Sequence, residues 1–529
     1  MHLASARGIT TLGLFGATAL AAPLALAQEP APQSAPAPTS APALSVRRVR
    51  REVPSEGLPP WERGVRVGAE YRVRFNAMSA IPLRPLPRTA ASSTDHLGQN
   101  TWGNQWLRLR GEAVFLENLK LTAQMDVVNG VAFGDLAYGV TPQALRSDEY
   151  GYPGVRFRFL YLDWETPIGL LRVGQMGFSW GLGMVANDGD TPTVFGDYRF
   201  GDIVRRVMLA TRPLGRRHPF VVALGGDWVA SDLLADYERR DELAFQGILA
   251  AYWGEGQNRV GAYGVYRWQE NRLADTLSAF FVDVYARWGF RDRRGGWNFA
   301  ALEAAFATGS TTYARTTERP EQAVRQFMAV LQLGRKSPTW DVVLEGGYAS
   351  GDSNTEDAVQ SRATIDPDHR VGLILFPEVL AANTARAAYL AQDPALSARP
   401  ARGSELIPTN GGVAGAAYLF PYGIFRPLPW LEVRLGAVLA FSTTDVADPY
   451  AQRALSRTVN WRGGDASARD LGFEVDGAVL VNHRVVDDLN FTGGVEGGVF
   501  LPGGAFTDQN GQSMDPIGLL RLRLGLRYR

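Results

Sequence analysis

VRVGAEYRVRFN, residues 65–76, alternates strictly between two kinds of side chain. The odd positions are apolar or aromatic, and the even positions are polar or glycine, with arginine at Arg66, Arg72 and Arg74. Because successive side chains of a strand point to opposite faces, the segment predicts a strand with one apolar and one charged face. The pattern returns in LRLRLGLRYR, residues 520–529. A soluble sandwich would bury the apolar face, whereas a membrane barrel would turn it to lipid and keep the charges in its lumen.

The N-terminal residues predict export. Residues 9–26 are rich in alanine and leucine, and residues 25–27 (ALA) fit the small-residue rule for signal cleavage. The same stretch approaches the length of a transmembrane anchor, but Pro23 interrupts it. We expect a signal peptide over 1–27, a Pro/Ala-rich disordered periplasmic linker over 28–60 and a barrel over 61–529. The RRVRR cluster at 47–51 is too short to predict nucleic-acid binding, so we expect no nucleic-acid partner.

The composition narrows the class further. The chain has no cysteine, which excludes disulfides and thiolate metal sites. Hydrophobic residues make up 46% of the chain, yet no later apolar run approaches the roughly 20 residues of a membrane-spanning helix. Basic and acidic residues balance at 54 each, so the net charge indicates no partner. An exported chain of this kind is a soluble β-protein or an outer-membrane barrel.

Strand length separates these two classes. Typical candidate strands span about 10–13 residues, longer than the roughly 5–6 of soluble strands and sufficient for a tilted membrane strand. The candidates are 65–76, 105–115, 119–129, 155–165, 169–177, 203–212, 218–230, 242–253, 258–270, 278–290, 296–308, 325–336, 339–350, 411–420, 430–442, 469–483, 488–500 and 517–528.

The connections between these candidates alternate in length. Short ones such as 116–118, 166–168 and 337–338 alternate with long ones such as 178–202 and 351–410. An up-and-down barrel with short periplasmic turns and long external loops has this arrangement. Aromatic residues near strand ends, such as Trp288, Trp340 and Trp430, are typical of the girdles at membrane interfaces.

On these features, residues 61–529 resemble the bacterial outer-membrane porin-like β-barrels. The arginine-rich faces and strand count are similar to the alginate-export type, and EGGYASGDSNTED at 345–357 resembles a strand that leads into an acidic loop of such proteins. The resemblance implies an all-β, transmembrane antiparallel up-and-down barrel of about 18 strands, with 16 as the alternative. It also implies a Gram-negative outer-membrane location, with membrane lipid and the assembly machinery as partners. The C-terminal aromatic residue that usually assists assembly is penultimate here, at Tyr528. Homo-oligomer formation stays open.

Inward-pointing polar faces would line the lumen with charge. Because closure sets the first strand beside the last, eight arginines would share one side, which we name the arginine wall. The expected pore-lining residues are the wall (Arg66, Arg72, Arg74, Arg108, Arg110, Arg521, Arg523, Arg527) and an acidic side (Glu345, Glu432, Glu474, Asp476, Glu496). Permanently charged guanidinium groups match carboxylates and phosphates, which predicts a porin for small hydrophilic, anionic solutes. Alternatively, these arginines pair with interior acids such as Glu70 and Glu112.

The 60-residue connection 351–410 decides between two functions. It opens on acidic residues, and Pro377 with Glu378 begins an Ala-rich stretch that predicts a helix. Folded into the lumen, this loop would constrict or gate a pore. If it instead filled the lumen, or projected outward as a docking surface, it would suit the alternative function, a non-conducting barrel that acts as adhesin or structural anchor.

Catalytic and metal sites have weaker support. Residues 187–190 and 352–354 group oxygen ligands, but neither segment has the spacing of an EF-hand. His369 lies near Ser361, Asp366 and Asp368, although proximity in sequence does not predict triad geometry. We expect no enzyme activity, no catalytic residue, no metal and no cofactor.

Overall fold

The computed structural model describes residues 61, 63–84, 96–97, 101–134, 154–197, 199–313, 319–393, 395–396 and 407–528. The expected signal peptide at 1–27 and linker at 28–60 lie outside these residues. Among the described residues, no helix has the length and apolar character needed to cross a bilayer.

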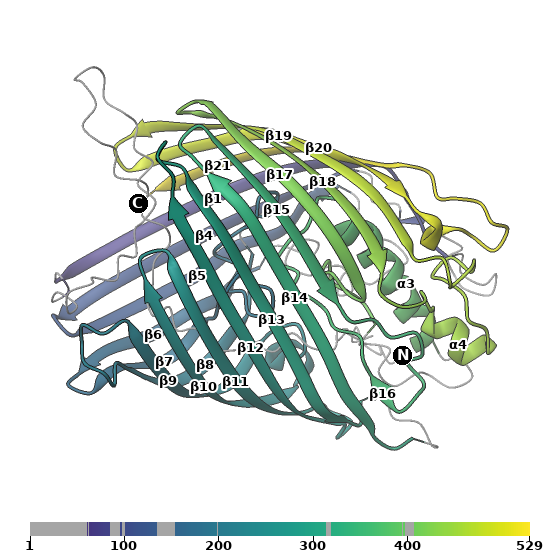
Figure 1. The fold of residues 1–529 in the computed structure, drawn as a ribbon, viewed down its shortest axis with the longest axis horizontal. Coiled ribbons are helices and arrows are strands. Elements are labelled where there is room, and N and C mark those ends of the chain that lie inside the picture. The colour runs from purple at the N-terminus through teal and green to yellow at the C-terminus, as the bar shows by residue number, and fades with distance from the viewer. Residues whose placement is uncertain are drawn as a thin grey trace, which may run out of the picture.

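Eighteen long antiparallel strands form a closed barrel (Figure 1). Each pairs with its neighbour in sequence, and β21 (Ile517–Tyr528) pairs with β1 (Gly64–Met78) to close the ring. The others are β4 (Thr101–Leu116), β5 (Leu119–Gly134), β6 (Arg156–Thr166), β7 (Gly169–Gly177), β8 (Ile203–Thr211), β9 (Phe220–Ser231), β10 (Leu243–Glu255), β11 (Asn258–Glu270), β12 (Thr276–Arg291), β13 (Trp297–Thr311), β14 (Gln322–Lys336), β15 (Trp340–Ala349), β17 (Ala416–Leu428), β18 (Leu431–Ser442), β19 (Asp470–Val486) and β20 (Leu489–Pro502).

Short elements lie in the connections. β2 (Ile81–Pro82) pairs with β3 (His96–Leu97), and β16 (Val359–Gln360) runs parallel to β14. The helices are α2 (Tyr237–Arg240), η2 (Leu375–Leu380), α3 (Ala381–Gln392), α4 (Pro449–Leu455) and η4 (Gly504–Phe506).

The structure confirms all 18 expected strands and excludes the 16-strand alternative. The largest boundary error is in β17, which starts at Ala416 instead of 411 and continues to Leu428 instead of 420. Pro421 and Pro427 lie in the part of β17 beyond the expected end, although proline donates no hydrogen bond to a neighbouring strand. The barrel accommodates Pro427 at an irregularity, since the pairing with β18 shifts register between Phe425 and Leu428.

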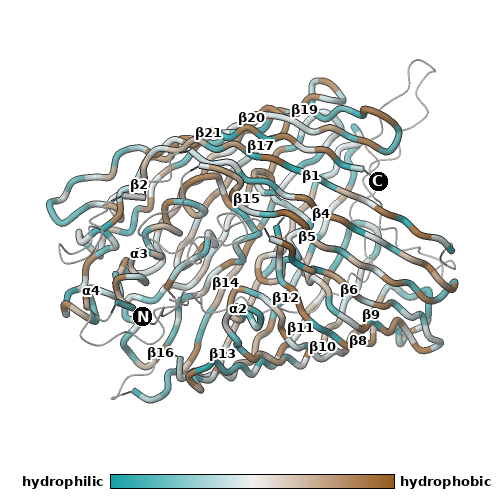
Figure 2. The backbone as a smooth tube through the Cα atoms, turned by 180° about the vertical axis from the view of Figure 1, so that it is seen from behind, coloured by the Kyte–Doolittle hydropathy of each residue, from teal (hydrophilic) through white to brown (hydrophobic). Residues whose placement is uncertain are grey.

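The outer surface of the barrel is apolar. On β21, Leu520, Leu522, Leu524 and Leu526 are exposed, whereas Arg521 between them is buried. Similar exposed leucine, valine and phenylalanine residues occur on the other strands, and Figure 2 shows hydrophobic and hydrophilic positions alternating along the chain. A soluble monomer rarely exposes apolar patches beyond a few hundred Å², so this surface suits a bilayer.

Two of the long connections fold into the lumen. We name residues 178–202 the short inner loop and residues 350–415 the long inner loop; most of the described residues in each range are buried. The long inner loop carries η2 and α3, which lie within the ring of strands (Figure 1). The structure thus confirms the helix expected after Pro377 and places its loop inside the barrel.

Candidate functional site

The arginine wall lies on β21, β1 and β4. Closure pairs Arg523 with Arg74, and β4 extends the same face because Arg108 pairs with Glu70 of β1. Alternation along each strand puts the remaining members on this face. The structure therefore brings together Arg66, Arg72, Arg74, Arg108, Arg110, Arg521, Arg523 and Arg527. That they line a conducting pore stays a prediction.

Acids of the barrel wall hold several of these arginines. Glu496 of β20 bridges Arg521 and Arg523, accepting from the Nη1 atom of each at 2.9 Å. Glu70 likewise accepts from Arg527 Nη2, at 2.9 Å, and from Arg72. Guanidinium groups removed from bulk water need such partners, because an unpaired buried charge is costly. Pairing with interior acids, the alternative raised from the sequence, is therefore present, and Glu496 belongs to the wall instead of facing it.

One further carboxylate reaches the wall from the short inner loop. Asp197 lies beside Arg72, Arg74 and Arg523, which come from two adjacent strands. Its Oδ1 accepts from Arg72 and lies 3.2 Å from Arg523 Nη2, and its Oδ2 lies 3.6 Å from Arg74 Nη1. We name Arg72, Arg74 and Arg523 the Asp197 site. The sequence analysis missed Asp197, because nothing in its local sequence shows that its loop turns inward.

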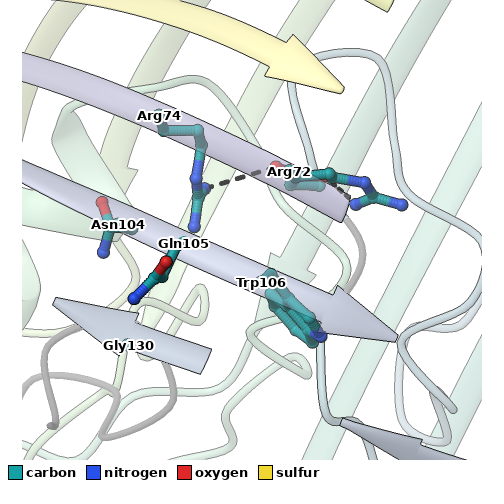
Figure 3. A pocket seen from close by; sticks show the side chains of 7 residues that line it. Arg72, Arg74, Asn104, Gln105, Trp106 and Gly130 are labelled. Carbon is teal, nitrogen blue, oxygen red and sulfur yellow. Dashed lines mark hydrogen bonds and ion pairs between the residues drawn. The ribbon is translucent and has the colours of Figure 1, made fainter. Parts of the chain in front are cut away.

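A small cavity adjoins the Asp197 site (Figure 3). Its volume of about 10 Å³ has room for about one water molecule. The lining residues are Arg72, Arg74, Asn104, Gln105, Trp106, Gly130 and Asp197.

Asp190 of the same loop contacts a second arginine pair. Its Oδ1 accepts from Arg108 Nη1 at 2.5 Å and from Arg158 Nη1 at 2.9 Å. Burial acts to raise the pKa of Asp190, but the charges of Arg158 and Arg108 outweigh it and hold that pKa below its usual value. Arg108 also binds Asp126 of β5, with 2.7 Å between its Nε and Oδ1. The sequence analysis missed Asp126, Asp190 and Arg158.

Within the expected acidic side, Glu474 holds the long inner loop. Glu474 of β19 accepts the backbone N–H groups of Leu373, Ile374 and Leu375 at 2.5, 2.8 and 2.6 Å. Three unsatisfied donors at the start of η2 are thereby paired. Asp476 lies two residues along the same strand and is buried. Glu474 is therefore an anchor for the loop.

Glu345 and Glu432 are also paired. Glu345 accepts from Tyr418 Oη at 2.7 Å and from Gln332 Nε2 at 2.7 Å, and lies 3.0 Å from His369 Nε2. Glu432 accepts from Arg426 Nε at 3.0 Å and from Arg434 Nε at 2.7 Å. Glu474 and Glu345 thus contact the long inner loop, whereas Glu432 and Glu496 pair with arginines of the barrel strands.

His369 joins the two inner loops. Its Nδ1 lies 3.2 Å from the carbonyl oxygen of Leu182, and its Nε2 faces Glu345. Burial acts to lower the pKa of His369, but the carboxylate of Glu345 and the charge of Glu303 outweigh it and raise that pKa to about 9. His369 is thus a cation at neutral pH. Its two ring nitrogens face the Leu182 carbonyl of the short inner loop and Glu345 of the barrel wall.

A catalytic triad of the kind considered from the sequence would need Ser361 within hydrogen-bond distance of His369. Ser361 donates its hydroxyl to the carbonyl oxygen of Gly351 at 2.8 Å, and neither ring nitrogen of His369 faces it. Residues 177–181, GFSWG, have the spacing of a hydrolase nucleophile elbow, which requires a strand, a sharp turn and a helix. Here β7 ends at Gly177 and the chain enters the lumen without a helix. The arrangement supports no nucleophile–base pair at His369.

The two oxygen-rich segments form local turns. Asn187 Oδ1 accepts from Gly189 N at 3.0 Å, and Asp352 Oδ1 accepts from Asn354 N at 2.9 Å, which are Asx-type turn contacts. Within the ranges that the structure describes, no group of three or more histidine, aspartate or glutamate residues is placed to hold a metal ion.

No family model matches the chain, and no curated protein matches it. The chain is similar to solved structures of bacterial outer-membrane porins. OccK11 (OpdR) of Pseudomonas aeruginosa is 11% identical, with 89% of this chain and 99% of that chain covered and a TM-score of 0.46. OccAB1 of Acinetobacter baumannii is 9% identical, with 89% and 98% covered and a TM-score of 0.47. OccD3 (OpdP) of Pseudomonas aeruginosa is 8% identical, with 88% and 91% covered and a TM-score of 0.47.

Proposed function

We propose that the chain is an outer-membrane channel that passes small hydrophilic, anionic solutes along the arginine wall. The observation that carries this proposal is the Asp197 site, where the wall already binds a carboxylate in the lumen. A narrow passage with charged, low-dielectric walls concentrates ions of opposite sign. The apolar outer surface supports the membrane location, and lipid, the assembly machinery and a homo-oligomer remain proposed partners.

Gating by the inner loops is part of the proposal. Both loops occupy the lumen, and the cavity beside the wall holds about one water. Solute passage then requires movement of the short inner loop, which reaches the wall chiefly through charged contacts. The likeness to the alginate-export type stays an expectation drawn from the sequence.

The competing function is a non-conducting barrel that serves as adhesin or structural anchor. The packing of the long inner loop favours it. Its apolar side chains are at most 1% exposed, as in the core of a soluble domain; they include Leu373, Phe376, Leu380 and Leu390. A loop packed so tightly would keep the lumen filled.

Conductance of the refolded protein in a planar bilayer, under a salt gradient, tests the proposal. We expect stable channels with anion selectivity. The triple variant Arg72→Gln, Arg74→Gln, Arg523→Gln should lower the anion-to-cation permeability ratio by roughly fivefold, because it removes three lumen charges. Arg325→Gln is the matched control, since this arginine is exposed on the outer face of β14.

Heat-modifiable migration in gels verifies folding of every variant. Silence of the folded wild-type protein contradicts an open channel and favours the adhesin or anchor. Equal selectivity in the wild type and the triple variant would exclude the arginine wall as the source of anion preference.

A further inference from the structure

Three exposed arginines lie in the short turn between β12 and β13, residues 291–296 (RDRRGG). Asp292 fixes the backbone of this turn, because its Oδ1 accepts from the N–H groups of Arg294 at 2.8 Å and of Gly296 at 2.9 Å. Among the described residues, no ion pair or side-chain hydrogen bond engages the three guanidinium groups. They are therefore available to a partner outside the chain, and they belong to Arg291, Arg293 and Arg294.

A fourth arginine, Arg335 of β14, connects this turn to the outer surface of the barrel. Its Nη2 lies 2.6 Å from Asp292 Oδ2, and its guanidinium carbon lies 5.0 Å from the ring centroid of Trp340 of β15. A cation above an indole ring is attracted by the negative face of the ring. Asp292 thus uses one oxygen for its own turn and the other for Arg335, which leaves the charges of the turn arginines uncompensated.

Aromatic side chains of the outer surface lie next to these arginines. Trp288 and Phe290 precede the turn on β12 and are 67% and 61% exposed, and Trp340 is 37% exposed. Alternation along β12 puts Trp288 and Phe290 on the same outer face as the exposed Val284. Aromatic residues near the ends of membrane strands lie at the boundary between hydrocarbon and headgroups. The turn that directly follows Phe290 is therefore at the level of the lipid headgroups.

The turn between β8 and β9 continues the positive charge along the same end of the barrel. Its Arg216 and Arg217 are exposed, and so is Leu214. The turn that lies between these two basic turns carries the exposed Glu255. On the far side of the barrel, the short turns instead expose Glu117, Asp487 and Asp488. We name Arg216, Arg217, Arg291, Arg293 and Arg294 the basic rim.

We propose that the basic rim binds the phosphate headgroups of anionic diacyl phospholipids, with phosphatidylglycerol as the simplest example, in the leaflet that surrounds the short turns. The planar fork of a guanidinium matches two phosphate oxygens, and these hydrogen bonds are charge-assisted. The neighbouring aromatic side chains favour a lipid over an acidic soluble protein, because they place the arginines among headgroups. The inference rests on the membrane location within the proposed function, and it does not depend on whether the barrel conducts.

Lipid preference is measurable with the refolded protein in phosphatidylcholine vesicles that contain brominated phosphatidylglycerol. Bromine on an acyl chain quenches the fluorescence of the tryptophans that the lipid touches, and Trp288 and Trp340 report on the leaflet at the basic rim. We expect phosphatidylglycerol to associate roughly fivefold more strongly than phosphatidylcholine, because arginines near a membrane surface attract anionic headgroups. High salt should remove this preference by screening the charges.

The triple variant Arg291→Gln, Arg293→Gln, Arg294→Gln should lower the preference for phosphatidylglycerol at least about twofold. The matched control removes the same charge from exposed arginines at the other end of the barrel, and it should keep the preference of the wild type. The control substitutions are Arg272→Gln, Arg457→Gln and Arg469→Gln. If the triple variant does not refold, Arg293→Gln with Arg294→Gln leaves the end of β12 intact.

Heat-modifiable migration verifies folding, and quenching by brominated phosphatidylcholine verifies insertion into the bilayer. An inserted wild-type protein without preference for phosphatidylglycerol overturns the proposal, and an acidic soluble protein then becomes the better partner for the basic rim. An unchanged preference in the folded triple variant overturns it as well. Absence of quenching by either lipid overturns the membrane location, and with it the proposed channel.

Discussion

The two inner loops share one lumen and pack apolar side chains into one common cluster, but they contact the barrel wall through different polar groups. The short inner loop forms ion pairs with the barrel. Asp190 pairs with Arg108 and Arg158, and Asp197 pairs with Arg72. The long inner loop packs apolar side chains in the lumen, and its backbone N–H groups donate hydrogen bonds to Glu474. One member of an ion pair can be replaced by a solute group of the same charge. A small hydrophilic solute cannot replace packed apolar side chains in the same way. We therefore expect an anion to compete for the ion pairs of the short inner loop, whereas the backbone N–H groups that Glu474 accepts offer no such exchange.

Removing the anchor of the long inner loop tests this contrast most severely. Glu474→Ala leaves three buried N–H groups without an acceptor, and we expect the packing of the loop to lose about 3 kcal/mol or more. Trypsin then cleaves after Arg386 of α3, a residue 1% exposed in the intact protein. Mass spectrometry of the fragments detects the cut.

Glu255→Ala, at the exposed end of β10, is the control for this experiment and should stay resistant. Resistance of Glu474→Ala equal to that of the wild type would mean that apolar packing alone holds the long inner loop.

The junction between the loops should respond to alkaline pH. The folded-state pKa of His369 is raised to about 9 from its ordinary 6.5, so its charge stabilises the fold fully below pH 6.5. That contribution, about 3 kcal/mol from the shift, is lost as the pH rises from 6.5 through 9. Thermal unfolding followed at several pH values should show a falling Tm over this window.

His369→Gln removes the titrating group and should flatten that part of the pH profile. A profile that keeps its slope in this variant would assign the alkaline transition to other groups.

The smallest expected effect concerns two acids where the loops meet. Burial and the charge of Asp366 raise the pKa of Asp202, and burial and the charge of Asp368 raise that of Asp366. A carboxyl group with a raised pKa in the folded state destabilises the fold when it ionises. This cost in stability grows as the pH rises above the ordinary pKa of an aspartate. Asp202→Asn should therefore stabilise the protein by on the order of 1 kcal/mol at pH 8 and by less at pH 5.

Denaturant unfolding at the two pH values measures this difference, and Asp445→Asn serves as the surface control. A loss of stability in Asp202→Asn at pH 8 would mean that the charge of Asp202 supports the loop contact.

The sequence by itself determined the barrel. Alternation with period two is a local property, so the stretches around Arg72 and Arg523 indicated both the strands and the faces of their charges. Closure then followed, because an up-and-down barrel sets its first strand beside its last. The largest boundary error was in β17, at both of its ends.

Only the tertiary structure decided what the charges do. Glu496 was expected only on an acidic side of the lumen but bridges two members of the arginine wall, and Glu474 binds backbone donors of a loop about 100 residues away. Asp197 gave no signal, because an aspartate in a Gly-rich connection resembles an ordinary turn residue. Contacts of this kind depend on which loops enter the lumen. Burial inside the closed barrel decides which loops enter the lumen, and the local periodicity of the sequence carries no information about this.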